Sequence, residues 1–219
     1  MRPHKFGLTE HDPTRAFAGF TIFSPSDGSE TFLIDMVGEV VHKWILPQQL
    51  GNYAQLLPNG NLLVSCLTGE GPKLQAAGGR ILELDWHGNI IWEHIDDLQH
   101  HDFNRCPNGN TVYLAWELIP TEEALGIIGG KPGSEHQDGG IYCDAVREVN
   151  PSGEVVFEWR MMEHFPFEKY PLRANRYRHE YAHANTCFVQ KDGNFYFWQL
   201  IIGVRGLEPP TPCSQNRCA

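Results

Sequence analysis

Two short motifs alternate along this chain, and each has the pattern of a β-hairpin. The first is an alternating apolar stretch, a turn with glycine and a second stretch that ends in tryptophan; it occupies residues 32–44, 81–92 and 146–159. The second has Asn-Gly or Asp-Gly between two apolar stretches; it occupies residues 53–65, 101–113 and 185–197. Asn-Gly and Asp-Gly between alternating strands are strong hairpin signals, because the turn needs a positive φ that glycine adopts freely.

The spacing of the turn glycines indicates the size of the repeating unit. Gly38 and Gly60 lie 22 residues apart, and Gly38 and Gly88 lie 50 residues apart. One unit is therefore two hairpins, or four strands, in about 50 residues, which matches the ~40–50 residue period of propeller blades. We predict an all-β chain that forms about three to four four-stranded blades of a β-propeller. A β-sandwich with coincidental turns is the alternative, and two motifs repeating in the same order argue against it.

Three units do not close a ring, since propellers typically have about 4–8 blades. The chain is therefore expected to be an incomplete propeller or to assemble with other copies as a homo-oligomer. We predict one partial propeller domain over residues 1–205. Residues 206–219 show no strand alternation and resemble a peptide read through the complement of a tRNA gene, so we expect a tail that is foreign to the domain. Two insertions, residues 118–140 and 161–181, are expected to form loops on one face, where propellers often bind their ligands.

Charge and hydropathy exclude several kinds of partner. The chain has 17 basic and 27 acidic residues and a formal net charge of -10, which disfavours binding to a phosphate backbone. No apolar run approaches the ~18 residues that span a bilayer, and residues 1–20 lack the apolar core of a signal peptide. We therefore expect a cytoplasmic protein that binds neither nucleic acid nor membrane. The six cysteines form no CxxC pair and are predicted to be free thiols.

Polar residues recur at one position of the second hairpin motif, where the innermost strand of each blade would begin. Asn52, His101 and Asn185 each lie eight residues before a turn glycine, and His100 and His183 are close neighbours in the sequence. In a propeller these positions face the central channel, and a group of histidine and asparagine donors suits an anion such as sulfate or phosphate. A structural hydrogen-bonding histidine in each blade is the simpler alternative. Metal binding is a competing use of histidine, but no HExxH motif is present, and we predict no metal and no cofactor.

At these residues the sequence resembles the aryl-sulfate sulfotransferases that do not use PAPS, over about residues 19–204. The resemblance rests on Gly-x-Val-x-x-x-Trp, Leu-Leu-Pro-Asn-Gly-Asn, His-His-Asp followed by Pro-Asn-Gly-Asn, and His-x-Asn-Thr. It implies a six-bladed propeller that transfers a sulfuryl group from an aryl sulfate to a phenol through a sulfated histidine. It also implies that His101 (or His100), His183 and Asn185 are catalytic residues that contact the sulfate, and that the sulfated histidine lies in a later blade.

Three hypotheses for the function follow. The first is a sulfotransferase-like enzyme, or an inactive relic of one, in which one histidine protonates the phenolate leaving group. The second is a non-catalytic propeller that serves as a binding scaffold. The third is a propeller hydrolase or lyase that uses histidine as acid and base, with or without a metal.

Overall fold

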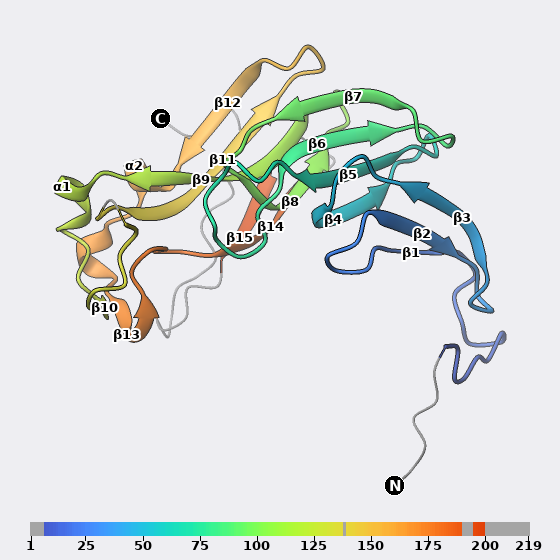
Figure 1. Ribbon diagram of the computed structural model, residues 1–219, viewed down its shortest axis with the longest axis horizontal. Helices are drawn as coiled ribbons and strands as arrows, with labels where there is room; N and C mark the ends of the chain where they lie inside the picture. The colour runs from blue at the N-terminus through green and yellow to red at the C-terminus, as the bar shows by residue number, and fades with distance from the viewer. Residues whose placement is uncertain (1–6, 138, 190–194, 200–219) are drawn as a thin grey trace, which may run out of the picture.

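The computed structural model describes residues 7–137, 139–189 and 195–199. Strands make up 48% of the structure and helices 6%, so the prediction of an all-β chain with repeated blade-like sheets is confirmed (Figure 1). The predicted tail over residues 206–219 lies outside the described residues, as do Gly193 and the end of the last predicted strand. No described helix is long and apolar enough to cross a membrane.

Two complete antiparallel sheets form the centre of the molecule, and in each the strands follow one another as a meander. The first contains β4 (Leu50–Leu56), β5 (Leu62–Leu67), β6 (Gly79–Leu84) and β7 (Ile90–Ile95). The second contains β8 (Gln99–Arg105), β9 (Thr111–Ile119), β11 (Ile141–Val149) and β12 (Val155–Arg160). They are flanked by a three-stranded sheet of β1 (Thr21–Phe23), β2 (Glu30–Ile34) and β3 (Val40–Ile45), and by a pair of β14 (Ala184–Val189) and β15 (Phe195–Gln199).

The boundaries of the blades differ from the order of motifs that the sequence suggests. Each four-stranded sheet joins the second hairpin of one sequence unit to the first hairpin of the next, as in β4-β5 followed by β6-β7. Periodicity determines the length of a repeat but not where the sheet begins, because that depends on which neighbouring strands form hydrogen bonds. In this arrangement the second hairpin motif supplies the first strand of three of the sheets, namely β4, β8 and β14.

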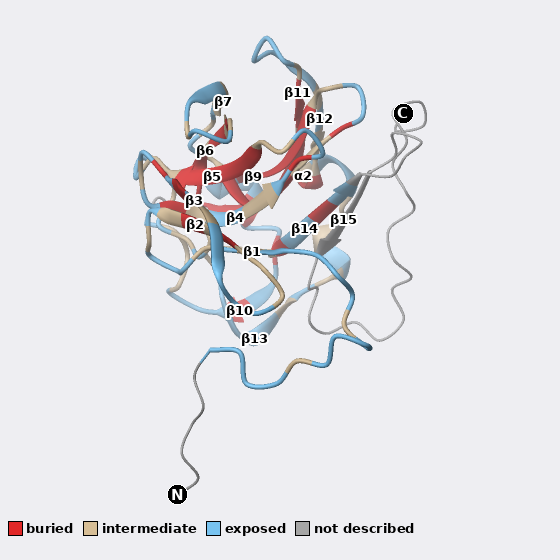
Figure 2. Ribbon diagram, turned by 90° about the vertical axis from the view of Figure 1, so that its right-hand side faces the viewer, coloured by how far each residue is buried: buried red, intermediate tan, exposed pale blue. Residues whose placement is uncertain are grey.

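Successive sheets pack face to face through alternating side chains of their middle strands, and these strands are mostly buried (Figure 2). In β5, Leu62 and Val64 pack toward Leu33 and Trp44 of the preceding sheet, whereas Leu63 packs toward Phe103 of the following one. The next interface is formed by buried residues of β9, β11 and β14 together with Cys106. Strands buried on both faces explain why the central strands are nearly continuous apolar runs.

The repeated polar residues of the motifs link the strands of a blade and link one blade to the next. In the Pro-Asn-Gly-Asn turn, the side-chain amide of Asn61 donates to Glu83 at 2.7 Å, and the equivalent Asn110 donates to Glu148 at 2.6 Å. The tryptophan that ends the first motif donates its indole N–H to a backbone carbonyl of the following blade, as Trp92 does to Pro151 at 3.0 Å. The sequence repeat is therefore a repeat of structural contacts.

The two insertions pack against each other instead of forming separate loops. Strand β10 (Gly129–Lys131) of the first pairs in parallel with β13 (Leu172–Tyr177) of the second. The short helices α1 (Thr121–Ala124) and α2 (Met161–His164) and a 3-10 turn over Phe167–Lys169 complete this region, at the left of Figure 1. Strand β13 leads directly into the segment that carries His183.

Candidate functional site: a histidine cluster on the innermost strands

Strands β4, β8 and β14 each bulge at the position where the polar residue of the repeat lies. In β4, Leu50 pairs with Cys66 and Ala54 with Val64, so the residues around Asn52 are extra. In β8, the pairs on either side of the bulge are His100 with Leu114 and Phe103 with Tyr113. In β14, they are Ala184 with Gln199 and Thr186 with Trp198. The three repeat-equivalent positions therefore share a bulged backbone. Bulges redirect side chains and are frequent next to active sites.

The bulge of β8 places His101 in an unusual backbone conformation. Its φ is +47°, a left-handed value that residues with a side chain rarely adopt. The conformation is held by its N–H, which donates to the carbonyl of Ala76 at 2.9 Å, and by the Asn52 amide, which lies 3.4 Å from the His101 carbonyl. Backbone strain of this kind collects at functional sites, where the surrounding structure holds a side chain in a required position.

Three of the four predicted site residues form one cluster. Nδ1 of His100 lies 2.8 Å from Nδ1 of His101, and the rings of His101 and His183 meet edge to face with their centroids 4.6 Å apart. His100 is fully buried, His101 is 6% exposed and His183 is half-buried. Asn185 lies on the adjacent strand β14 with its side chain exposed, and the described residues include no hydrogen bond from its amide to the histidines. His101 is therefore at the centre of the cluster, with a buried histidine on one side and a more accessible one on the other.

Two acidic residues that the sequence analysis missed hold the outer histidines. Oδ1 of Asp144 lies 3.3 Å from Nε2 of His100, and its other oxygen accepts the N–H of Ala184 at 3.0 Å. Oε2 of Glu180 lies 2.8 Å from Nδ1 of His183. Asp144 could have been suspected because it interrupts an apolar strand, where a carboxylate is rare unless it is paired. Glu180 had no comparable signal, since it lies in an insertion.

Trp116 connects the two ends of the cluster. Its ring stacks on the imidazole of His100 with centroids 4.5 Å apart. Its indole N–H donates to Oε1 of Glu180 at 3.1 Å, which leaves the other carboxylate oxygen for His183. One aromatic side chain therefore orients both the buried histidine and the acid that binds the accessible one.

The environment drives the pKa values of His101 and His183 in opposite directions. Burial, reinforced by the neighbouring His100 and His183, lowers the pKa of His101 to about 3. The hydrogen bond that His183 donates to Glu180 raises the pKa of His183 above its usual value, against the effect of burial. At neutral pH, His101 is thus a neutral imidazole beside a histidine that keeps its proton to a higher pH, and titratable pairs separated in this way are typical of acid-base sites.

The aspartate of the His-His-Asp motif has a different task. Asp102 accepts hydrogen bonds from Phe103 N–H at 2.9 Å, Thr186 Oγ1 at 2.5 Å and Cys187 N–H at 3.0 Å. Two of these donors belong to β14, so the carboxylate joins the innermost strands of two successive sheets. This clamp holds the strand that follows His183 next to the strand that carries His101.

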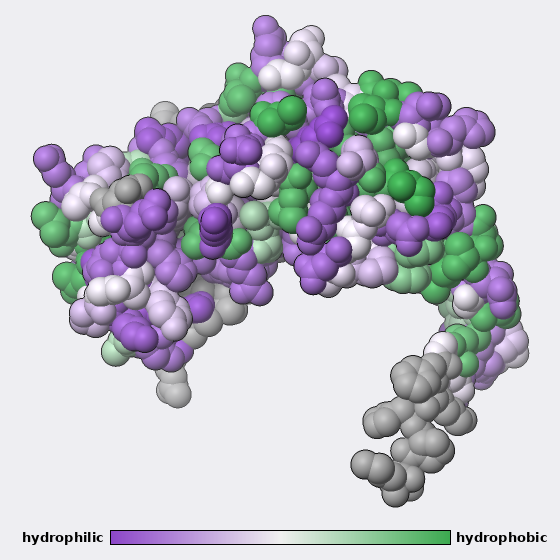
Figure 3. All heavy atoms as spheres, viewed as in Figure 1, coloured by the Kyte–Doolittle hydropathy of each residue, from purple (hydrophilic) through white to green (hydrophobic). Residues whose placement is uncertain are grey.

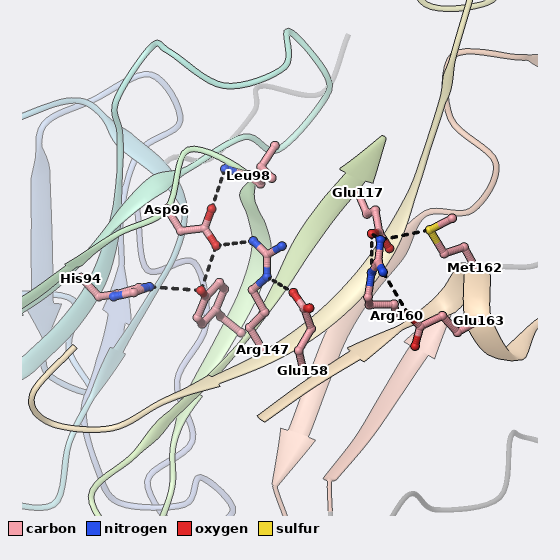
Figure 4. Close-up of polar contacts among 10 residues, drawn as sticks. His94, Asp96, Leu98, Glu117, Arg147, Glu158, Arg160, Met162 and Glu163 are labelled. Carbon is pink, nitrogen blue, oxygen red and sulfur yellow. Dashed lines mark hydrogen bonds and ion pairs between the residues drawn. The ribbon is translucent and has the colours of Figure 1, made fainter. Parts of the chain in front are cut away.

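A second polar network lies between the blades but apart from the histidine cluster (Figure 4). Arg147 Nη1 lies 2.7 Å from Asp96 Oδ2, its Nε lies 2.7 Å from Glu158, and Tyr113 donates to the same oxygen of Asp96 at 2.8 Å. Burial alone would raise the pKa of Asp96, but Arg147 and Tyr113 lower it below its ordinary value. Because Asp96 follows β7 and Arg147 lies on β11, this network is structural and connects two sheets.

Within the described part of the chain, no group of three or more His, Cys, Asp or Glu residues has the geometry to hold a metal ion. The four described cysteines, at positions 66, 106, 143 and 187, are buried free thiols.

Comparison with known proteins gives no family for this chain. No model of a known protein family matches it, and no curated protein matches it. Among solved structures it is similar to a protein of unknown function from Bacteroides caccae, with a TM-score of 0.46 and 16% sequence identity. That similarity covers 90% of this chain and 58% of the other, so the chain spans little more than half of that protein's length.

Proposed function

We propose that this chain carries part of the active site of an enzyme that transfers a sulfuryl group from an aryl sulfate to a phenol. The supporting observation is the neutral His101 beside the more basic His183, with ring centroids 4.6 Å apart. Such a pair supplies both a proton acceptor and a proton donor at one pH, and a reaction that exchanges one phenol for another needs both. The resemblance of the His-His-Asp and His-x-Asn-Thr motifs to aryl-sulfate sulfotransferases supports the same chemistry.

In the first half of the proposed reaction, the bond between the aryl oxygen and sulfur breaks. The sulfuryl group passes to a histidine nitrogen, which the resemblance assigns to a later blade, and protonated His183 gives its proton to the departing phenolate as the general acid. The exposed amide of Asn185 lies on the strand after His183 and donates to a sulfate oxygen. Donors arranged around the oxygens stabilise the charge that develops in the transition state.

In the second half, the acceptor phenol attacks sulfur and the nitrogen–sulfur bond breaks. The phenol loses its proton to the free nitrogen of neutral His101. A proton then moves from His101 to His183 across the edge-to-face contact, and the pair returns to its starting state. The proton that the acceptor phenol loses thereby replaces the proton that His183 gave to the departing phenolate.

A hydrolase is the second candidate, because the acid-base pair is complete within the described residues whatever the nucleophile. In that reaction water replaces the acceptor phenol. Dependence of product formation on added phenol distinguishes the two reactions.

The test uses p-nitrophenyl sulfate as donor and phenol as acceptor, with release of p-nitrophenol followed by absorbance. His183→Gln is expected to slow the reaction by about 100-fold or more, the usual effect of removing a general acid or base. The matched control is His87→Gln, since His87 lies exposed in a turn away from the cluster and its replacement should leave the rate unchanged. An inactive wild-type chain, or a His183→Gln variant as active as the control, would overturn the proposed function; sulfate binding without turnover would then favour the scaffold.

A further inference from the structure

We infer that Asp144 and His100 act as positioning residues that determine which nitrogen of His101 carries its proton. The inference concerns the geometry of the cluster, and its role in catalysis rests on the proposed function. Asp144 is on the third strand of its sheet and His100 on the first, so both reach His101 from the interior of the same blade. All three side chains are buried, which keeps water from competing for their hydrogen bonds.

The argument begins at the carboxylate. Oδ2 of Asp144 already accepts the backbone N–H of Ala184, and this bond fixes the orientation of the group. Oδ1 is then directed to Nε2 of His100 at 3.3 Å. Since a carboxylate only accepts, it favours the tautomer of His100 that has its proton on Nε2. Neither Nε2 of His100 nor Oδ1 of Asp144 makes a hydrogen bond to a described group, so the carboxylate acts on this tautomer through the electrostatic attraction of the 3.3 Å contact.

The second step follows from the short contact between the two histidines. Nδ1 of His100 and Nδ1 of His101 are 2.8 Å apart, so one of them donates and the other accepts. With its single proton on Nε2, His100 can only accept at Nδ1. His101 must therefore carry its proton on Nδ1, which leaves Nε2 of His101 with a free lone pair.

This chain of contacts accounts for the unusual backbone of β8 at His101. The left-handed φ of +47° at His101 brings two consecutive side chains together, although neighbours on a regular strand point to opposite faces. The stacking of His100 on Trp116 and the bond from Gln99 Nε2 to the His100 carbonyl at 3.0 Å hold the first imidazole in place. The strained backbone thus aligns His100 with His101, and the free nitrogen of His101 becomes the proton acceptor of the proposed reaction.

The decisive variant is Asp144→Asn. The Ala184 N–H requires an acceptor, so the amide oxygen of the new side chain replaces Oδ2 and its NH₂ group faces Nε2 of His100. That donor forces the proton of His100 onto Nδ1, His101 must accept at its own Nδ1, and its proton moves to Nε2. The replacement keeps the size of the side chain. It reverses every donor and acceptor along the contacts from Asp144 through His100 to His101, which we call the relay.

The experiment is ¹⁵N NMR of the imidazole nitrogens in the full chain at neutral pH. In the wild type, Nε2 of His101 should give the signal of an unprotonated nitrogen, and in Asp144→Asn the signal of a protonated one. Asp96→Asn is the matched control, because Asp96 is a partly buried aspartate in the network around Arg147 and does not contact the cluster. In this control the tautomer of His101 should stay as in the wild type.

His100→Phe provides a second variant in case Asp144→Asn does not fold, since it keeps the aromatic stack on Trp116 but removes Nδ1. Without that acceptor, Nε2 of His101 should show a mixture of both tautomers. The relay is overturned if Nε2 of His101 gives the same signal in the wild type and in either folded variant. The spectrum does not depend on turnover: a tautomer switch in a wild type that transfers no sulfuryl group supports the relay and overturns only the proposed function. Where the wild type is active, Asp144→Asn should lower the rate by about 100-fold or more.

Discussion

His101 shows how much of this site depends on the surroundings of one residue. Its imidazole is neutral because burial and two neighbouring histidines lower its pKa, and it faces His183, whose pKa is raised by Glu180. Both pKa values differ from that of a histidine in water, which is about 6.5. The chemistry at the scale of the residue is therefore a property of the contacts with Asp144, Glu180 and Trp116.

The pH dependence of the reaction should reflect these two pKa values. Because His101 stays neutral down to about pH 3, its protonation should not limit the rate between about pH 4 and 7. The rate should fall as pH rises through the raised pKa of His183, because the acid loses its proton there. Glu180→Gln should move this alkaline limb to lower pH, since the amide that replaces the carboxylate no longer stabilises the charged imidazole.

The measurement is the rate of p-nitrophenol release from p-nitrophenyl sulfate as a function of pH for both proteins. Circular dichroism at each pH shows that the fold is retained. An alkaline limb at the same pH in the wild type and in Glu180→Gln would show that His183 is not the acid that limits the rate.

At the scale of the element, the hairpin turn is the unit that the repeat preserves. The two asparagines of Pro-Asn-Gly-Asn do more than allow the turn, because they hold a glutamate on the third strand of the sheet. The turn thereby ties its hairpin to the next strand of the sheet. This contact, repeated in both complete sheets, gives a physical reason for the recurrence of the motif.

Replacing Asn110 by alanine should destabilise the chain measurably. The change leaves the carboxylate of Glu148, which is 2% exposed, without the donor at 2.6 Å. Loss of one partner from a buried polar group costs about 1–3 kcal/mol, and more when that group is charged. Urea unfolding followed by tryptophan fluorescence would measure the change.

Asn89→Ala is the control for Asn110→Ala, because the Asn89 amide donates to Asp85 in an exposed turn. We expect a loss within about 0.5 kcal/mol there, as for most surface changes. Equal losses in the two variants would mean that the turn as such, and not the buried glutamate, requires asparagine.

At the scale of the whole molecule, the interfaces between sheets combine a dry apolar interior with a few polar links. Asp96, Arg147 and Glu158 form one such link, and Asp102 forms another beside the site. The outer strands, by contrast, expose apolar side chains such as Val41, Ile91 and Val156, and Figure 3 shows apolar patches among hydrophilic ones. The rigidity of the cluster therefore depends on how the sheets pack and not on any single strand.

Arg147→Gln tests the polar link between the sheets. The change removes the cation from between Asp96 and Glu158 and leaves Asp96, whose side chain is 15% exposed, without its ion pair. Breaking a largely buried pair in this way costs about 3 kcal/mol. The urea midpoint of unfolding should fall accordingly.

The comparison variant for Arg147→Gln is Lys43→Gln, which breaks the exposed pair of Lys43 and Glu30 at 2.8 Å. An exposed pair contributes only about 0–1 kcal/mol. Similar midpoints for the two variants would contradict a structural role of the Arg147 network.

Much of this protein follows from its sequence alone. All six hairpin motifs form strands at the predicted places, because alternation and turn glycines act over a few neighbouring residues. The equivalence of Asn52, His101 and Asn185 also follows from the repeat, and each lies at a bulge of an innermost strand.

Only the tertiary structure decides which strands share a sheet and what the histidines contact. The blade boundary depends on the hydrogen bonds between β5 and β6, which join residues from different sequence units. Asp144 and Glu180 meet the cluster from another strand and from an insertion, at sequence distances where no periodic pattern applies. Local sequence determines the conformation of each hairpin, whereas the state of an imidazole depends on buried charges and donors that only the packing of the sheets brings within a few ångströms.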